Sequence, residues 1–250
     1  MRRALGLLFL AFLGCLLGCD ADAETEHGSQ AVELAAARTI RFSGHDWIVK
    51  DGDGFGPGPN RWRADNVFVD DAGALHLRVA RDASGRWSCA EIRSVEPFGW
   101  GTYRFDVEGR LDELPPQAVL GLFNYPRWGT PPDATSEIDV EIAQWGDPNA
   151  DRGSFTLWGG GAEPLWSERF PLTLYGTHTS HAFEWRSDVV RFASRHGHGA
   201  NGVPIALREH RPVGGAGEDP RPVHLNLWLF RGEEPPSGFE VVVRRFVYAP

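Results

Sequence analysis

The chain has 250 residues, 42% of them hydrophobic, and a net charge of −9 at neutral pH. This length fits one large all-β domain or two small ones, and the hydrophobic fraction is sufficient for a packed core. The acidic balance argues against a nucleic-acid partner.

The N-terminus has the pattern of a targeting segment. A basic Met1-Arg2-Arg3 precedes the apolar run Ala4–Gly18, as in a secretory signal peptide, and this run is too short for an ordinary membrane-spanning helix. It ends in Leu16-Leu17-Gly18-Cys19, which resembles a bacterial lipobox. An ordinary signal peptide or an uncleaved anchor are the alternatives. We expect residues 1–18 to be a lipoprotein signal peptide and Cys19 to carry lipid, which would anchor the protein in the bacterial cell envelope, on the periplasmic or outer-surface side.

Residues 19–38 are acidic, alanine-rich and poor in aromatic residues, which favours a tether with at most a helical turn around Val32–Ala37. If Cys15 leaves with the signal peptide and Cys19 carries lipid, only Cys89 remains. The mature domain then has no intrachain disulfide, and Cys89 is expected to be a strand thiol, inert if buried.

From residue 39 to residue 250 the chain consists of short β runs separated by turn residues such as Asp-Gly, Gly-Pro and Asn-Gly. No amphipathic helix of about ten residues or more is predicted there, and the stretch Gly214–Pro222 is predicted to be a loop rather than a linker. Regularly spaced strands of this kind predict one all-β domain, a β-sandwich or a jelly roll. Examples of the predicted strands are Asn66–Asp70, Leu75–Ala80, Thr102–Val107, Val119–Tyr125, His181–Trp185, Val189–Ala193, Val223–Phe230 and Glu240–Tyr248.

The stretch Ser136–Ile142 alternates three carboxylates with three branched apolar residues. Strand periodicity therefore places Glu137, Asp139 and Glu141 on one face. Neighbouring like charges at roughly 6–7 Å repel by about 2–3 kcal/mol at an effective dielectric near 20, which raises at least one carboxyl pKa. A carboxylate beside a protonated carboxylic acid is what retaining glycoside hydrolysis requires. An exposed strand with a solvated acidic face is the alternative.

Tryptophans flank this strand at Trp128, Trp145 and Trp158. Flat aromatic rings beside an acid pair can stack on the apolar faces of sugar rings, although any single Trp can equally be a core residue. The pattern indicates a carbohydrate-active site. No Cys/His set has zinc-like spacing, and no Gly-rich phosphate-binding loop occurs.

The acidic motif resembles the Glu-x-Asp-x-Glu signature of glycoside hydrolase family 16, the concanavalin A-like jelly-roll glucanases. It lacks the extra bulge residue of the laminarinase-like members, so it is more similar to the branch of lichenases and xyloglucan transglycosylases. Further stretches resemble the family in the same order along about 190 residues: Asn60–Val67, Cys89–Ser94, Phe98–Tyr103, Thr177–Trp185 and Leu225–Trp228.

The resemblance implies an all-β fold, a jelly-roll β-sandwich of two antiparallel sheets. It also implies a retaining, endo-acting hydrolase of a β-glucan-type polysaccharide, with Glu137 as nucleophile and Glu141 as general acid/base. Asp139 would hydrogen-bond the nucleophile and tune both pKa values. The outer Cα atoms of the motif are about 13 Å apart at strand rise, so the two Glu side chains must lean inward over Asp139 to reach the roughly 5–5.5 Å of a retaining pair. A transglycosylase or a non-catalytic glycan-binding lipoprotein on the same fold are the alternatives.

The expected sugar-stacking residues are Trp100, Tyr125, Trp128, Trp158 and Trp228. The expected polar contacts are Glu91, Arg93 and Asn226. We expect no organic cofactor and a monomer.

The sequence also departs from lichenases. Thr156 and Trp158 stand where lichenases have an Asn and a Tyr that contact sugar, and Arg245 stands where they have an acidic calcium ligand. A guanidinium offers only donors and a positive charge. We therefore expect no metal, unless another carboxylate such as Glu240 supplies the ligand.

Overall fold

The computed structural model describes residues 37–126, 135–213 and 215–250. The predicted signal peptide, Cys19, Trp128 and nearly all of the predicted tether lie outside these residues, so those predictions stay predictions. Residues 36–250 form one compact unit. None of the helices in the described part of the chain is long and apolar enough to cross a membrane.

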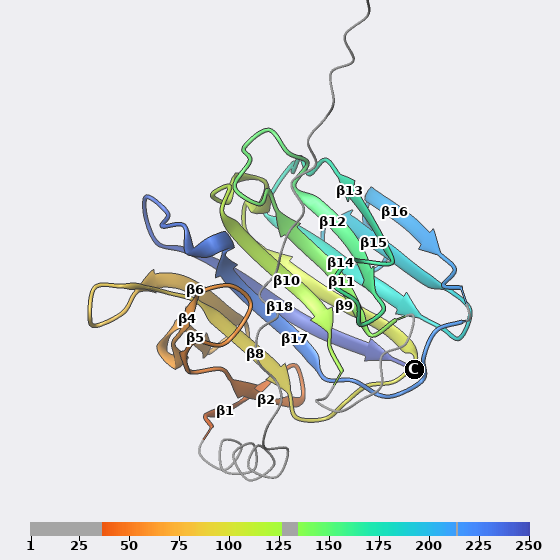
Figure 1. Cartoon of the computed structure of the whole chain (residues 1–250), viewed down its shortest axis with the longest axis horizontal. Coiled ribbons are helices and arrows are strands. Elements are labelled where there is room, and N and C mark those ends of the chain that lie inside the picture. The colour runs from red at the N-terminus through yellow and green to blue at the C-terminus, as the bar shows by residue number, and fades with distance from the viewer. Residues whose placement is uncertain (1–36, 127–134, 214) are drawn as a thin grey trace, which may run out of the picture. The chain divides into compact units, whose positions relative to one another are not determined.

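The first large sheet carries the acidic motif on a central strand and faces the viewer in Figure 1. All its strand pairs are antiparallel. Its strands, in spatial order, are β1 (Thr39–Phe42), β2 (His45–Val49), β8 (Ala90–Ser94), β17 (Val223–Leu229), β10 (Ala118–Asn124), β11 (Glu137–Ala143), β12 (Gly153–Trp158) and β13 (Trp166–Phe170).

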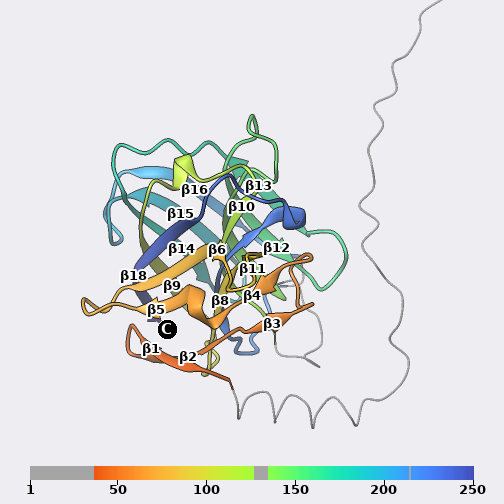
Figure 2. The same cartoon turned by 90° about the vertical axis from the view of Figure 1, so that its left-hand side faces the viewer.

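The second sheet packs behind the first, as the two views in Figures 1 and 2 show. Its strands, in spatial order, are β16 (Pro204–His210), β15 (Val190–His196), β14 (His178–Trp185), β9 (Gly101–Glu108), β18 (Phe239–Ala249), β6 (Leu75–Arg81) and β5 (Val67–Val69). Short strands β7 (Trp87–Ser88), β3 (Gly52–Asp53) and β4 (Arg61–Trp62) complete the described strands. Within the described residues the only helical segments are the 3-10 helices η1 (Ala64–Asn66), η2 (Leu111–Glu113) and η3 (Phe230–Gly232).

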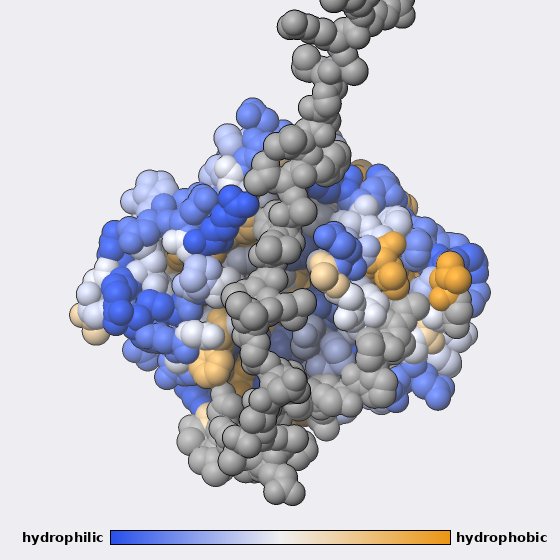
Figure 3. Space-filling view, in the orientation of Figure 1, coloured by the Kyte–Doolittle hydropathy of each residue, from blue (hydrophilic) through white to orange (hydrophobic). Residues whose placement is uncertain are grey.

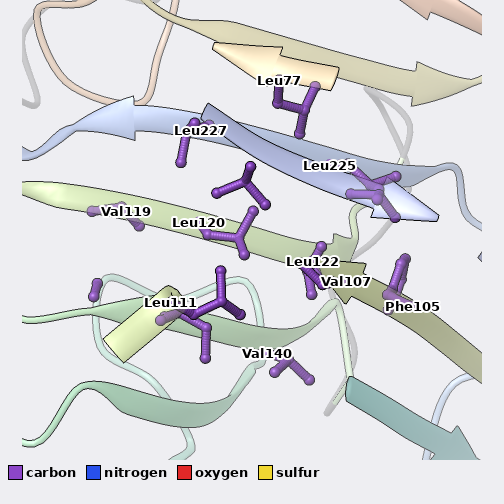
Figure 4. Packing of buried hydrophobic residues seen from close by; sticks show 14 of the residues in the cluster. Leu77, Phe105, Val107, Leu111, Val119, Leu120, Leu122, Val140, Leu225 and Leu227 are labelled. Carbon is purple, nitrogen blue, oxygen red and sulfur yellow. The ribbon is translucent and has the colours of Figure 1, made fainter. Parts of the chain in front are cut away.

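The core lies between the two sheets and follows from strand alternation. On β11, Ile138, Val140 and Ile142 are fully buried. They pack with leucines of the neighbouring strands and with residues of the second sheet such as Phe105 and Val107 (Figure 4). Burying one face of β11 in this way fixes its register, because a slip of one residue would move the acids into the core.

These observations confirm the predicted all-β jelly-roll sandwich, and each predicted strand is present with its ends shifted by up to three residues. Strands β13 and β16 are among those that the sequence did not predict by name. Both lie at sheet edges and are largely solvent-exposed, so their sequences lack the apolar alternation that marks a half-buried strand. Cys89 is buried, and burial raises the pKa of its thiol to about 12, which fits the expected inert thiol.

The assigned core predicts which leucine substitutions destabilise the fold. Leu122 of β10 is fully buried, whereas Leu207 of β16 is 46% exposed. We expect Leu122→Ala to lower the free energy of unfolding by about 2–5 kcal/mol through lost burial and a cavity, and Leu207→Ala to change it by less than about 1 kcal/mol. Urea unfolding followed by circular dichroism measures both, and equal losses in the two variants would contradict the assigned core.

Candidate active site

The three carboxylates of β11 form one row on the solvent-facing side of the first sheet. On the neighbouring strand β12, Trp158 pairs with Glu137, Thr156 with Asp139 and Ser154 with Glu141. On the other side β10 places Phe123 against Asp139 and Gly121 against Glu141. Figure 3 views the molecule from this side and shows largely hydrophilic residues around the face, where grey atoms do not cover it.

Asp139 is the buried centre of the row. Its Oδ2 accepts a 2.8 Å hydrogen bond from the indole nitrogen of Trp158. Its Oδ1 is buried and accepts no hydrogen bond within the described residues. Burial and the neighbouring charge of Glu137 raise the pKa of Asp139 well above its ordinary value, and the Trp158 bond opposes that rise. A proton shared with the Glu137 carboxyl would satisfy the otherwise unpaired Oδ1 atom.

The outer two acids are also shifted upward. Burial raises the pKa of Glu137, with a contribution from the charge of Glu141, while the interaction with Asp139 opposes the rise. Burial and the charge of Asp139 raise the pKa of Glu141 to about 8, and Arg169 and the Ser154 hydroxyl partly offset this. The row therefore retains protons at neutral pH, as the sequence pattern predicts.

A close approach between strands shapes the floor beside Glu141. The backbone N–H of Gly121 donates a 3.1 Å hydrogen bond to Oδ1 of Asn226 on β17. A Cβ at position 121 would lie only 2.4 Å from that oxygen, so any larger residue there would displace the Asn226 side chain. The amide nitrogen of Asn226 donates no hydrogen bond to any described residue and is available to a ligand.

A polar network continues the floor toward β8. The Glu91 carboxylate is buried and pairs with Lys50 at 2.8 Å and with Nδ1 of His224 at 3.1 Å. Burial acts to raise the pKa of Glu91, but His224 and Lys50 outweigh it, so the pKa lies below its ordinary value. Lys50, the only lysine of the chain, also lies 4.1 Å over the ring of Trp62. Glu91 is thus held as a carboxylate whose partners fix its position.

Aromatic rings lie at both ends of the acid row. Near Glu137 are the half-exposed Tyr125, whose pKa is raised by burial and by the charge of Glu137, and Trp158. Phe123 stacks on His224 with ring centroids 5.0 Å apart. Beyond Glu141, Trp145 packs edge-to-face against Trp228 and Phe230. Such flat surfaces suit sugar rings.

The structure brings most predicted binding residues to this face, with two differences in detail. Glu91 on β8 and Asn226 and Trp228 on β17 alternate with buried apolar residues and lie on the acid side of the sheet, and Arg93 lies opposite His224. Trp228 is only 8% exposed, packed against Trp145, and is largely a core residue. Trp100 donates its indole N–H to the carbonyl of Gly217 at 2.7 Å and packs against the core.

Four residues of the site were not predicted: Lys50, Phe123, Ser154 and His224. A signal existed for two of them, because Phe123 lies two residues after Gly121 and His224 two residues before Asn226, on the same strand faces. Trp145 was noted as a flanking tryptophan, but its position beside Trp228 depends on the turn after β11, where its φ is +55°.

No metal site emerges among the described residues, since no group of three or more His, Cys, Asp or Glu side chains there could hold an ion. Arg245 lies on the exposed side of β18, opposite Asp106 of β9 in the second sheet. The expectation that no metal is bound stays a prediction.

Comparisons with known proteins agree with this geometry. A β-glucanase from Paenibacillus macerans is 28% identical over 190 residues, which are 75% of this chain and 73% of the relative. The structure of a Bacillus licheniformis β-glucanase aligns with a TM-score of 0.63 at 19% identity, covering 86% of this chain and 99% of that one. A glycosyl hydrolase family 16 protein from Mycobacterium smegmatis gives a TM-score of 0.57 at 17% identity, over 81% and 90% of the chains. No family model matches the chain.

The jelly roll and these relatives define a glycoside hydrolase. Within that class the chain is similar to the lichenase-type β-glucanases, and its fold is that of solved glycoside hydrolase family 16 proteins.

The raised pKa of Glu141 makes stability depend on pH. The folded pKa of about 8 exceeds the ordinary 4.5, so the folded state binds more protons and stability falls as pH rises from about 4.5 to about 8. Glu141→Gln removes this loss. We expect its melting temperature to exceed that of the wild type by several degrees at pH 8 and to approach it at pH 4.

The exposed Glu163→Gln variant is the matched control and should melt with the wild type at both pH values. A Glu141→Gln variant that melts no higher than wild type at pH 8 would contradict the raised pKa.

Proposed function

We propose that the chain is a retaining, endo-acting hydrolase of β-glucan-type polysaccharides. The observation that carries the proposal is the row of three carboxyls on β11 with raised pKa values, in which Asp139 is buried and the two Glu side chains are partly exposed, in a homologue of β-glucanases. A general acid must be protonated near neutral pH, and Glu141, with a pKa of about 8, meets this condition.

The first chemical step forms a glycosyl-enzyme bond. The Glu137 carboxylate attacks the anomeric carbon while the Glu141 carboxylic acid gives its proton to the departing glycosidic oxygen. Glu137 must be ionised for this attack. Asp139, next along the same face, supports ionisation when it holds the shared proton, since a protonated Asp139 donates to the Glu137 carboxylate.

The second step returns the enzyme to its starting state. Glu141, now a carboxylate, takes a proton from a water molecule, and the oxygen of that water attacks the anomeric carbon and displaces Glu137. Two displacements at one carbon retain its configuration. Asn226, Glu91, Tyr125 and Trp158 would hold the sugars on either side of the scissile bond.

Two alternatives use the same face. In a transglycosylase, a sugar hydroxyl would replace water in the second step. A non-catalytic glycan-binding protein would need none of the three carboxyls, and their burial with raised pKa values destabilises the fold above pH 4.5. That cost favours catalysis over binding alone.

Substitution of the outer acids tests the proposal. We expect Glu137→Gln and Glu141→Gln each to lower the release of reducing ends from a panel of β-glucans by at least about 10³-fold, because each removes one chemical step. Glu163→Gln should retain full activity, and far-ultraviolet circular dichroism checks the fold. Turnover near the wild-type level in either outer-acid variant would refute the assigned roles. Transfer products formed with an added acceptor sugar would indicate the transglycosylase.

The stereochemistry of the product is a separate prediction. We expect NMR spectra recorded in the first minutes of hydrolysis to show the β-anomer, with the α-anomer appearing later through mutarotation. Outer acids on one strand face, on either side of Asp139, would leave too little room for a water opposite the leaving group. Initial release of the α-anomer would contradict a double displacement.

We also propose that a lipid on Cys19 anchors the mature protein to the membrane. The basic start of the chain, the apolar run and the lipobox-like Leu16–Cys19 support this proposal. We expect wild-type protein in the membrane fraction of the native cells, and Cys19→Ser to be released or left unprocessed. Mass spectrometry of the N-terminus gives the direct readout. A wild-type chain without lipid would end this proposal.

A further inference from the structure

A second polar site lies on the opposite side of the sandwich from the acid row. It is an open groove of about 650 Å³ over β9, β14, β18 and the turn that follows β15. On β9, Tyr103, Phe105 and Val107 are buried in the core. Alternation therefore turns Arg104, Asp106 and Glu108 outward into the groove. The groove shares no residue with the site on the first sheet.

Two carboxylates at the base of the groove orient two arginines. Asp106 Oδ1 accepts from the Nε of Arg104 at 3.2 Å and from the backbone N–H of Gly199 at 3.0 Å. Glu108 accepts from the Nε of Arg244. Both arginines are held by Nε, and their terminal Nη groups contact no acceptor within the described residues. Each guanidinium therefore keeps donors free for a ligand.

A β-bulge adds a third arginine. The register between β18 and β9 shifts between Val243 and Arg245, and both Arg244 and Arg245 are exposed. In a regular strand one of two consecutive residues would point into the core. The Arg245 side chain, opposite Asp106, makes no hydrogen bond or ion pair with any described residue. The bulge thus presents an extra cation to the groove.

The charges around the groove favour an anion. Three guanidinium groups face two carboxylates, and both carboxylates already accept hydrogen bonds. The rings of His178 and His198 line the same groove, and His198 donates its Nε2–H to the carbonyl of Val107 at 3.1 Å. The carboxylate of Asp70 interacts electrostatically with Arg244, but it already accepts a hydrogen bond from the N–H of Ala74 and is hydrogen-bonded to His76. This concentration of arginine stands out on a chain of net charge −9.

We infer that this groove binds a phosphate-type oxyanion, either free or carried on a larger ligand. The planar fork of each arginine matches two oxygens of such a group, and fixing the fork by a carboxylate lowers the entropy lost on binding. Three arginines suit a doubly charged tetrahedral anion better than a single carboxylate. The groove volume leaves room for a sugar-sized group attached to the anion.

Titration calorimetry with inorganic phosphate, at ionic strength held constant with sodium chloride, tests the inference. We expect saturable one-site binding, weakened about tenfold in Arg245→Gln, as for one lost charge-assisted hydrogen bond, and abolished in Arg244→Gln/Arg245→Gln. Arg41→Gln removes the same charge at another exposed position and should bind like the wild type. Lack of saturable binding to the wild type up to about 20 mM, or equal weakening by Arg41→Gln, would overturn the inference.

Two further probes distinguish the source of the anion. Hexose 6-phosphate that binds more tightly than phosphate, with the unphosphorylated hexose as control, would indicate a soluble sugar phosphate. Binding to vesicles of phosphatidylcholine with phosphatidic acid, and not to phosphatidylcholine alone, would indicate a lipid headgroup. In either case the double variant must lose the binding while it hydrolyses β-glucan at the wild-type rate. Binding that the double variant retains counts against the groove.

Discussion

The central constraint of this molecule is a row of three carboxyls, one buried and two partly buried, on one face of a single strand whose other face is the hydrophobic core. Strand alternation ties the two faces together: the packing of Ile138, Val140 and Ile142 determines where Glu137, Asp139 and Glu141 lie. Burial then penalises the charged form of every acid in the row, and their mutual repulsion adds to this. The core therefore stabilises a site that the acids alone would disfavour.

The surroundings of the row differentiate chemically similar groups. Asp139 has the indole N–H of Trp158 on one oxygen, and Glu141 has Arg169 and Ser154 nearby. The pKa of Glu137 is shifted by burial first and, among its neighbours, only by other carboxyls. Glu91 is also buried, yet Lys50 and His224 keep it ionised. Burial near partners gives an anion and burial near like charges gives an acid, and the site uses both outcomes.

The sequence predicted what depends on local periodicity. The acid row, the main strands and the sandwich class follow from alternation and turn residues within short stretches. The resemblance added Glu91 and Asn226 to the site. The network of Lys50, Glu91 and His224 was not predicted, because it depends on register between segments far apart in the chain. The exposed edge strands β13 and β16 and the bulge at Arg244 also carry no local signal, since they are set by how neighbouring strands pair.

The most direct test of this account is substrate-free: a carbon-detected NMR titration of the side-chain carboxyls, with Glu137→Gln and Glu141→Gln used to assign the signals. We expect at least one carboxyl of the β11 row to stay protonated at pH 7, and Glu141 to titrate near pH 8. Three carboxyls that are all ionised by about pH 5, like ordinary Asp and Glu side chains, would contradict it.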